Sequence, residues 1–180
     1  MRKEIFREIE IPHGVEAEIE GTVLKVKGPE GESKKNFNLK GLSLVKKDNK
    51  IILGNKSSTK KEKKLINSNA AHIKNMINGV QHKFEYHLKV CFSHFPISVE
   101  MKGKEVSIKN FLGEKIPRKT VVPEGVDVDI NKDIIKVKSV DKELAGQVAA
   151  NFETVTRIRN RDRRIFQDGI FMTKKSGKEI

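Results

Sequence analysis

Several residue types are scarce in this chain, and each scarcity excludes a class of protein. The 180 residues include one cysteine, Cys91, which excludes an intrachain disulfide framework and indicates a reducing compartment. No stretch approaches the roughly 20 consecutive apolar residues of a membrane helix, and the N-terminus lacks the apolar run of a secretory signal. We therefore expect a cytoplasmic protein with no membrane partner.

Aromatic residues are also few, with nine phenylalanines, one tyrosine and no tryptophan. Single-stranded nucleic acids are bound largely by stacking bases on such rings, so the composition disfavours that mechanism. We expect the phenylalanines in the core of the protein; those concerned are Phe6, Phe37, Phe84, Phe92 and Phe152. Recognition of a backbone or of a folded shape remains possible without them.

Motifs for catalysis and cofactor binding are missing as well. Neither G-x4-G-K-[ST] nor G-x-G-x-x-G occurs, and Gly28-Pro29-Glu30-Gly31 is better interpreted as a turn between strands. A metal enzyme is the alternative, and it would need His82, His87, Cys91 and His94. These residues span a strand-like segment and would lie too far apart to bind one ion. We expect no enzyme activity, metal, cofactor or small-molecule substrate.

Positive charge is what the sequence has in excess. It contains 37 Lys and Arg against 24 Asp and Glu, a net charge of +13, which favours a polyanionic partner such as nucleic acid. Residues 157–180 form a basic C-terminal tail with a net charge of +5. Arginine binds phosphate in a bidentate manner, so its clustering there is the strongest signal for nucleic-acid binding; the five residues are Arg157, Arg159, Arg161, Arg163 and Arg164.

A second basic run occupies residues 56–64, where five lysines accompany one acidic residue. A solvated start of a helix explains this run as well as phosphate contact does. Its lysines are therefore only additional candidate contacts; they are Lys60, Lys61, Lys63 and Lys64.

The chain also repeats itself. Residues 15–32 align with 97–114 at an offset of 82, and both copies alternate polar and apolar residues around a glycine, which predicts a hairpin. Residues 49–52 match 132–135 at an offset of 83, and a helical pattern follows in each copy at an offset of 79. The apolar helix positions are Ile66, Ala70, Ile73, Ile77 and Val80 in the first copy and Leu144, Val148, Phe152 and Val155 in the second.

This repetition predicts an α+β fold of two duplicated domains, residues 1–82 and 83–180, each a mainly antiparallel sheet closed by one helix. A competing alignment of Pro12–Val15 with Pro123–Val126 is interpreted as shared turn chemistry. In the basic tail, residues 167–169 are predicted to form a tight turn that brings Ile165-Phe166 and Ile170-Phe171 together. Residues 174–180 have nothing to bury, and we expect them to be mobile without a partner.

Five ordered motifs resemble a known family. They are Val26–Gly31, Asn75–Val80, His94–Ile97, Ile108–Lys115 and Phe166–Ile170, which together span nearly the whole chain. The series resembles large-ribosomal-subunit protein six in its archaeal and eukaryotic form. Bacterial members end differently, in Pro-Glu-Pro-Tyr-Lys-Gly-Lys-Gly.

The resemblance implies a structural, non-catalytic protein that binds large-subunit rRNA near the stalk base and contacts neighbouring ribosomal proteins. It implies rRNA contacts in the tail, Arg157–Lys175, which adds Gly169, Lys174 and Lys175 to the five arginines. It also implies contacts in the loop 110–115, through Asn110, Phe111, Gly113 and Lys115. A free-standing RNA-binding regulator is the alternative, because it would share the same distribution of charge.

Overall fold

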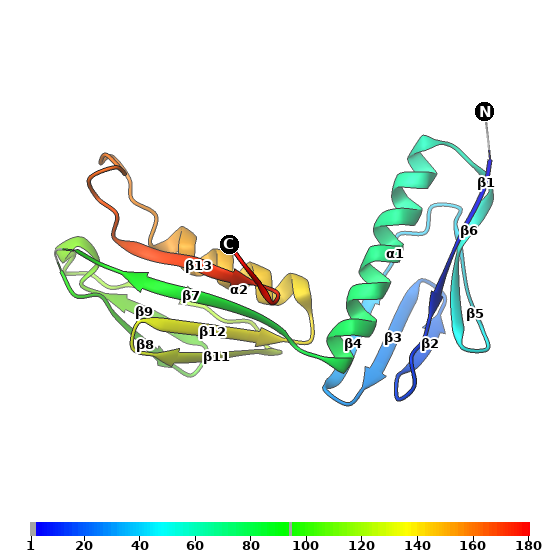
Figure 1. Cartoon of the computed structure of the whole chain (residues 1–180), viewed down its shortest axis with the longest axis horizontal. Coiled ribbons are helices and arrows are strands. Elements are labelled where there is room, and N and C mark those ends of the chain that lie inside the picture. The colour runs from blue at the N-terminus through cyan, green and yellow to red at the C-terminus, as the bar shows by residue number, and fades with distance from the viewer. Residues whose placement is uncertain (1–2, 94) are drawn as a thin grey trace. The chain divides into compact units, whose positions relative to one another are not determined.

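The computed structural model describes residues 3–93 and 95–180, and it divides the chain into two compact units, Met1–Lys83 and Phe84–Ile180 (Figure 1). Each unit contains its own sheets and one long helix, and we describe each unit by itself. Antiparallel pairing is general, because every strand pair in the structure runs antiparallel.

Unit 1 combines two three-stranded sheets with the helix α1 (Lys60–Gln81). The first sheet has the order β1 (Lys3–Glu10), β6 (Lys50–Ser58), β5 (Ser43–Lys47), and the second has the order β2 (Glu16–Glu20), β3 (Val23–Gly28), β4 (Gly31–Asn36). The helix contacts strands of both sheets. Its predicted apolar face is confirmed, since all five positions from Ile66 to Val80 are buried.

Unit 2 repeats this arrangement and extends it. The helix α2 (Lys142–Val155) packs against a five-stranded sheet, in the order β11 (Val126–Asn131), β12 (Ile134–Ser139), β7 (Phe84–Cys91), β13 (Gly169–Lys175), β14 (Lys178–Glu179). A three-stranded sheet has the order β10 (Arg118–Val121), β9 (Glu105–Lys109), β8 (Ser98–Lys102), and a 3-10 turn, η1 (Phe111–Gly113), follows β9. Buried apolar side chains from β7, β9, β12 and α2 form one core.

The structure confirms the duplication. Gly21 and Gly103 occupy the same hairpin position in the two copies, and both have a φ of +62°, which glycine adopts without a steric cost. The predicted offset of 83 for the later strand is wrong by one residue. Ile51 and Leu53 are the buried positions of β6, and they correspond to the buried Ile135 and Val137 of β12, at an offset of 84.

The end of the chain differs most from the sequence-based expectation. Residues 169–175 form β13, which pairs with β7 along its whole length, and β14 continues the sheet. The predicted turn between two apolar pairs is wrong, because Ile165 is 67% exposed whereas Ile170 is buried in the core. Residues 174–180, which we expected to be mobile without a partner, are instead paired in the sheet: β13 and β14 include residues 174–175 and 178–179, and Ile180 donates its backbone N–H to the Thr173 carbonyl at 3.0 Å.

Two of the phenylalanines expected in the core lie at the surface. Phe37 and Phe152 are buried, but Phe6 is 37% exposed and Phe92 is 44% exposed. Both exposed rings lie on or directly after the first strand of a unit, β1 and β7 respectively. Their positions show that alternation alone does not fix which face of a sheet is covered.

Candidate nucleic-acid interface

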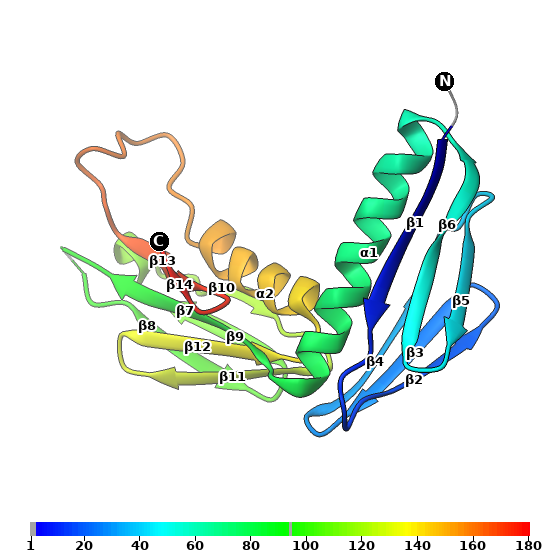
Figure 2. The same ribbon diagram turned by 45° about the vertical axis from the view of Figure 1, so that its right-hand side comes forward.

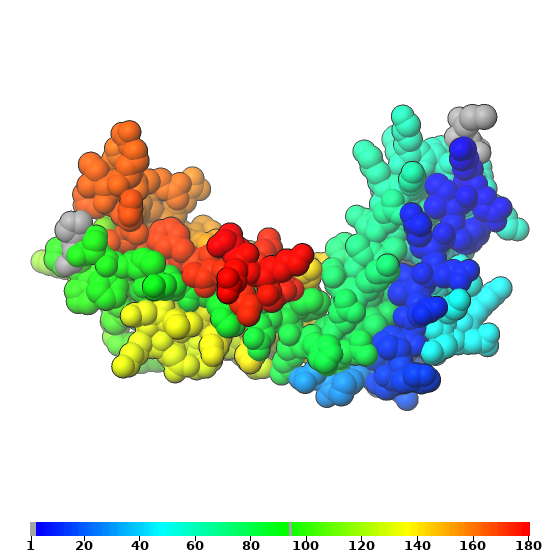
Figure 3. Space-filling model, viewed as in Figure 1, coloured from blue at the N-terminus to red at the C-terminus, as the bar shows by residue number. Residues whose placement is uncertain are grey.

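The arginine cluster lies on one excursion of the chain, residues 157–168, which we call the arginine loop. It connects the end of α2 to the start of β13 and extends away from the sheet (Figures 1 and 2). It forms a protrusion on the surface of unit 2 (Figure 3). All five arginines of this loop are exposed, so their guanidinium groups are available to an external partner.

The arginine loop starts and returns at one point, which the Thr156 side chain holds. Thr156 is buried; its hydroxyl donates to the Phe152 carbonyl at 3.1 Å and accepts the Ile170 N–H at 3.0 Å. One hydroxyl therefore joins the last turn of α2 to the first residues of β13. The loop protrudes, but both of its ends are fixed to rigid elements.

A second contact anchors the C-terminal end of the loop. The Asp168 side chain is 2% exposed, and its Oδ1 accepts hydrogen bonds from the backbone N–H of Ser93, at 2.7 Å, and from the Ser93 hydroxyl, at 2.8 Å. Ser93 follows β7 directly, so this contact joins segments 75 residues apart in sequence. The aspartate of the Gln-Asp-Gly motif is therefore part of the scaffold that holds the loop.

Within the loop, most of the arginine charge is left uncompensated. Arg164 forms an ion pair with Asp162 at 2.8 Å, and hydrogen bonds from Arg164 lower the pKa of the Asp162 carboxyl. The Arg161 guanidinium lies 4.8 Å from the centre of the Phe166 ring, a cation–π distance. Among the residues that the structure describes, Arg157, Arg159, Arg161 and Arg163 make no ion pair.

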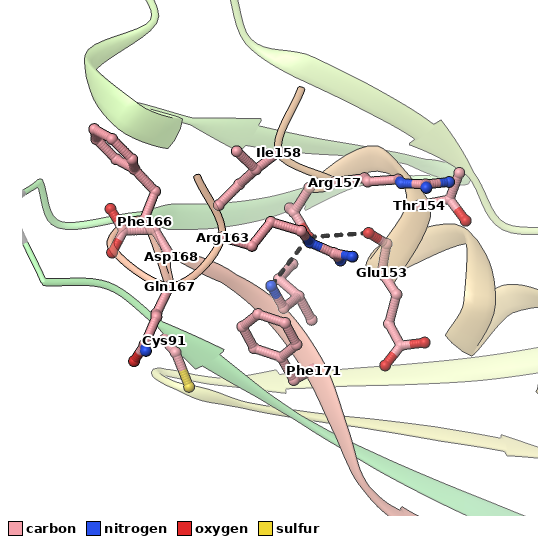
Figure 4. Close-up of a pocket in the computed structure, with 12 residues that line it drawn as sticks. Cys91, Glu153, Thr154, Arg157, Ile158, Arg163, Phe166, Gln167, Asp168 and Phe171 are labelled. Carbon is pink, nitrogen blue, oxygen red and sulfur yellow. Dashed lines mark hydrogen bonds between the residues drawn. The ribbon is translucent and has the colours of Figure 1, made fainter. Parts of the chain in front are cut away.

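A cleft of about 870 Å³ lies beneath the arginine loop. Figure 4 shows the side chains that line it, from the loop, the end of α2 and β13. Arg157 and Arg163 contribute to its wall, together with the rings of Phe166 and Phe171 and the carboxylate of Glu153. Guanidinium groups beside apolar rings provide contacts to phosphates and to the faces of bases.

The second predicted segment, residues 110–115, has an unusual backbone. Asn110, Leu112 and Gly113 all have positive φ. For a residue with a side chain such as Leu112, this left-handed conformation is less favourable by about 1–2 kcal/mol. The Asn110 side chain donates to the Pro96 carbonyl at 3.0 Å, which holds the segment against the loop that follows β7. Gly113 and Lys115 are exposed.

One residue that the sequence reasoning missed, Arg118, connects the two predicted segments. Its guanidinium binds Glu114 through two hydrogen bonds, of 2.6 and 2.8 Å, and donates to the carbonyls of Val155 and Arg157, at 2.6 and 3.3 Å. It also lies 4.3 Å from the centre of the Phe111 ring. A spacing of four residues brings opposite charges together on a helix, but residues 114–118 are not helical, so no local signal in the sequence identified Arg118.

The electrostatics of this contact follow from its geometry. The Arg118 hydrogen bonds hold the pKa of the Glu114 carboxyl below its ordinary value of 4.5, and the nearby charge of Arg161 contributes in the same direction. Glu114 is therefore ionised at neutral pH. The structure brings the loop 110–115 and the start of the arginine loop together through this pair.

Other predicted contact residues are placed differently. The Phe111 ring is 1% exposed and belongs to the core of unit 2, so it supports the loop 110–115 from inside. Gly169 is buried, and a Cβ there would come within 3.1 Å of the Phe171 ring. Lys174 is half-buried on β13 and Lys175 is exposed. Neither Phe111 nor Gly169 therefore offers a surface to RNA.

The four additional lysines lie in the first two turns of α1. Thr59 and Glu62 cap this helix: the Glu62 carboxylate accepts the Thr59 N–H at 2.8 Å, and the Thr59 hydroxyl accepts the Lys61 N–H at 3.3 Å. All four lysines are exposed. Cations at a helix N-terminus oppose the helix dipole, so the lysines do not stabilise α1. Their contact with RNA stays a prediction.

The described residues contain neither a cluster of metal ligands nor a membrane-spanning helix. No group of three or more potential ligands converges among residues 3–93 and 95–180, and His94, one of the four candidates, lies outside the described residues. Neither of the two helices in the described part of the chain is long and apolar enough to cross a membrane.

Comparison with known proteins adds an independent observation. The sequence pattern of the family described as Ribosomal protein L6 matches residues 11–83 and 95–169, one segment in each unit. The chain belongs to the Ribosomal protein L6 family. Each of the two matched segments lies in one copy of the duplication, and the second segment ends at Gly169, where β13 begins.

Relatives in this family match the chain over nearly its whole length. The chain is 42% identical to a large ribosomal subunit protein uL6 from Methanothrix thermoacetophila, over 97% of this chain and 99% of the relative. It is 42% identical to the protein of the same name from Sulfurisphaera tokodaii, over 95% and 92%. It is 45% identical to the one from Nanoarchaeum equitans, over 96% and 94%. All three Ribosomal protein L6 relatives are archaeal.

Proposed function

We propose that this chain is a structural, non-catalytic constituent of the large ribosomal subunit in the cytoplasm, and that it binds large-subunit rRNA. Family membership over both units supports the first statement. The proposal that the chain binds rRNA is supported by the arginine loop. Four of its exposed arginines form no ion pair with any described residue, and Thr156 and Asp168 fix the loop to the scaffold from which it protrudes. Such an arrangement positions guanidinium groups for phosphates at little entropic cost.

The proposed interface has two parts in unit 2. One is the arginine loop, with the cleft beneath it, and the other is the exposed part of the loop 110–115, with Gly113 and Lys115. Arg118 joins them, so RNA would meet both as one surface. From the family resemblance we also propose that the rRNA contacted lies near the base of the factor-binding stalk.

The lysines at the start of α1 are a weaker candidate. They are exposed and concentrated, but the structure shows no built site around them. We propose that they add sequence-independent attraction to RNA without selecting a site.

A double substitution tests the arginine loop. Arg159→Ala combined with Arg163→Ala should weaken binding to purified large-subunit rRNA and make the slope of log affinity against log salt shallower by about two. The matched control removes the same charge from the β8–β9 hairpin, through Lys102→Ala combined with Lys104→Ala. Equal loss of affinity in the two variants would show that net charge, and not this loop, binds the RNA.

A further inference from the structure

Unit 2 has two strands, β13 and β14, that have no counterpart among the described residues of unit 1, and the difference leaves an open sheet edge in unit 1. In unit 2, β7 is paired on one side with β12 and on the other with β13. In unit 1, β1 takes the place of β7, and among the described residues it pairs only with β6. The same backbone hydrogen bond occurs at the end of β1 and in β7. The Ile11 N–H donates to the Asn49 carbonyl at 2.9 Å, and the Val90 N–H donates to the Asp133 carbonyl at 2.7 Å.

The backbone groups at this open edge can be identified from the register. In an antiparallel ladder, alternate residues direct their N–H and C=O to the same side. Because Ile11 faces β6, Ile9 and Arg7 face it too, whereas Glu10 and Glu8 face the open edge. The residues of β7 that correspond to Glu10 and Glu8 are paired with β13.

Strand β1 and helix α1 lie side by side (Figure 2), and residues of both line a groove of about 360 Å³ beside this edge. Its floor is apolar, with the buried Ile9 and Ala70, and the small side chain of Ala71 leaves it open to solvent. The half-exposed Phe6 forms one side. In unit 2, the corresponding helix α2 has β13 lying against it, so the same fold shows a strand occupying this position.

The charge of the groove indicates what kind of strand would fit. Lys74 corresponds to Glu153 of α2, whose carboxylate accepts the Met172 N–H of β13 at 2.8 Å. Lys74 is exposed, and no described residue forms an ion pair with it. Arg7 also lines the groove, whereas Glu8 is already paired with Lys50 at 3.2 Å. The groove therefore offers two cations to an incoming carboxylate.

We propose that the open edge of β1, with its groove, binds an extended segment of a neighbouring large-subunit protein. The segment adds to the sheet as an antiparallel strand, places apolar side chains on Ile9 and Ala70, and directs a carboxylate to Lys74. This inference rests on the proposed place of the chain in the large subunit, but it uses none of the rRNA-binding residues. It supplies the unit 1 sheet with the strand that β13 supplies in unit 2.

Two other occupants fit less well. RNA would bring phosphates against the acidic side chains of Glu4, Glu8 and Glu10 along β1, which repel them. A second copy of this chain would place two such acidic strands side by side, and like charges directly opposite one another destabilise strand pairing. A polypeptide alone pairs with the row of N–H and C=O groups at the edge.

Crosslinking in assembled subunits tests the proposal. A photoreactive benzoylphenylalanine in place of Phe6 should crosslink to a protein in large subunits purified by sedimentation. Substitution of Glu8 by proline removes an N–H that points to the open edge, a position where sheets tolerate proline, and should reduce the crosslink about tenfold. The matched control, Glu8→Ala, keeps the N–H and should leave the crosslink unchanged.

A second variant tests the same contact without a proline, in case the Glu8→Pro protein misfolds. Lys74→Glu changes only an exposed side chain of α1 and should also reduce the crosslink. A crosslink to rRNA or to a second copy, no crosslink at all, or a protein crosslink insensitive to both variants would overturn the proposal. Loss of rRNA binding would instead appear as absence of the chain from the subunit fraction, so the two failures are distinguishable.

Discussion

At the scale of single residues, Arg118 shows how one side chain can organise an interface that it need not touch. Its guanidinium donates to the Glu114 carboxylate, to the Val155 carbonyl at the end of α2 and to the Arg157 carbonyl at the start of the arginine loop, and it lies over the Phe111 ring. Three of these partners belong to segments predicted to contact RNA. Arg118 is therefore a positioning residue for the proposed interface.

Replacement of Arg118 by alanine should destabilise unit 2 by about 1.5–3 kcal/mol, because hydrogen bonds to a charged group are lost and its partners lose their donor. Affinity for rRNA should fall as well, since the two loops lose their connection. Urea unfolding and filter binding measure these effects. Lys119→Ala, which removes a neighbouring exposed ion pair with Glu105, is the control and should change unfolding by less than about 1 kcal/mol. Equal unfolding of the two variants would argue against this role.

The same pair gives a prediction for pH. Because Arg118 lowers the pKa of Glu114 in the folded state, the pair stabilises the protein above the ordinary pKa of about 4.5 and ceases to do so as the pH falls through the lowered value. We expect Glu114→Gln to be less stable than the unmodified chain at pH 7, and the two to converge below pH 4.5. Urea unfolding from pH 7 to pH 3 measures the difference, in which the other carboxylates cancel. If the difference in unfolding free energy between the two proteins stayed constant from pH 7 to pH 3, the charge of Glu114 would contribute nothing to stability.

For Phe111 and Asp168, the sequence did not show that the side chain is buried. The family resemblance implied Phe111 as a contact, but its ring is 1% exposed and belongs to the core of unit 2. Asp168 was interpreted as a turn residue, but it accepts two hydrogen bonds from Ser93, far away in sequence. Neither contact has a local signature, because each depends on where a distant segment lies.

At the scale of elements, local patterns predicted most of the fold. Alternation around Gly21 and Gly103 predicted the two hairpins, and the helical spacing from Ile66 to Val80 predicted the buried face of α1. The strand β13 was missed because its second half is basic and resembles a solvated tail. Its position is decided by the open edge of β7, which becomes visible only when the sheet is assembled.

This strand changes what a truncation would report. Removal of residues 157–180 would delete β13 from the five-stranded sheet and expose the side of β7, so loss of RNA binding would be mixed with loss of folding. The arginine loop can instead be removed alone, because Thr156 and Ile170 are joined by a hydrogen bond of 3.0 Å. Its two ends are thus already close together.

We expect a variant in which a short Gly-Ser linker replaces residues 158–167 to keep its fold and to lose most of its affinity for rRNA. Closing a shorter loop costs little conformational entropy, so its melting temperature should stay near that of the intact chain. Circular dichroism and filter binding measure the two properties. A truncation after residue 168, which removes β13 and β14, is the contrasting variant and should unfold unit 2. Unfolding of the linker variant as well would make the loop part of the scaffold.

At the scale of the whole molecule, duplication has produced two units with the same framework and different surfaces. Unit 2 has the inserted turn η1 and the arginine loop, and it fills the edge of its first strand with β13. Unit 1 has the shorter Gly-Pro-Glu-Gly turn, a longer helix and an open edge. The same framework therefore presents a protruding loop in unit 2 and an unpaired strand edge in unit 1.

Net charge and local geometry give opposite predictions for these units, which makes them a decisive test. Residues 1–83 carry 18 basic and 10 acidic residues, a net charge of +8, whereas residues 84–180 carry 19 and 14, a net charge of +5. If net charge governed binding, unit 1 expressed alone would bind rRNA more tightly. We expect the reverse, because non-specific attraction is screened by salt while guanidinium groups fixed on a rigid loop retain specific contacts.

The measurement is filter binding of each separate unit to large-subunit rRNA between about 50 and 200 mM salt, where counterion release weakens non-specific binding most visibly. Unit 1 should lose its affinity steeply over this range, whereas unit 2 should retain a salt-resistant part that Arg159→Ala with Arg163→Ala removes. Each unit has its own buried core, so circular dichroism can first establish that it folds. If unit 1 bound rRNA more tightly than unit 2 at the higher salt concentration, the result would indicate that the lysines of α1, and not the arginine loop, form the main interface.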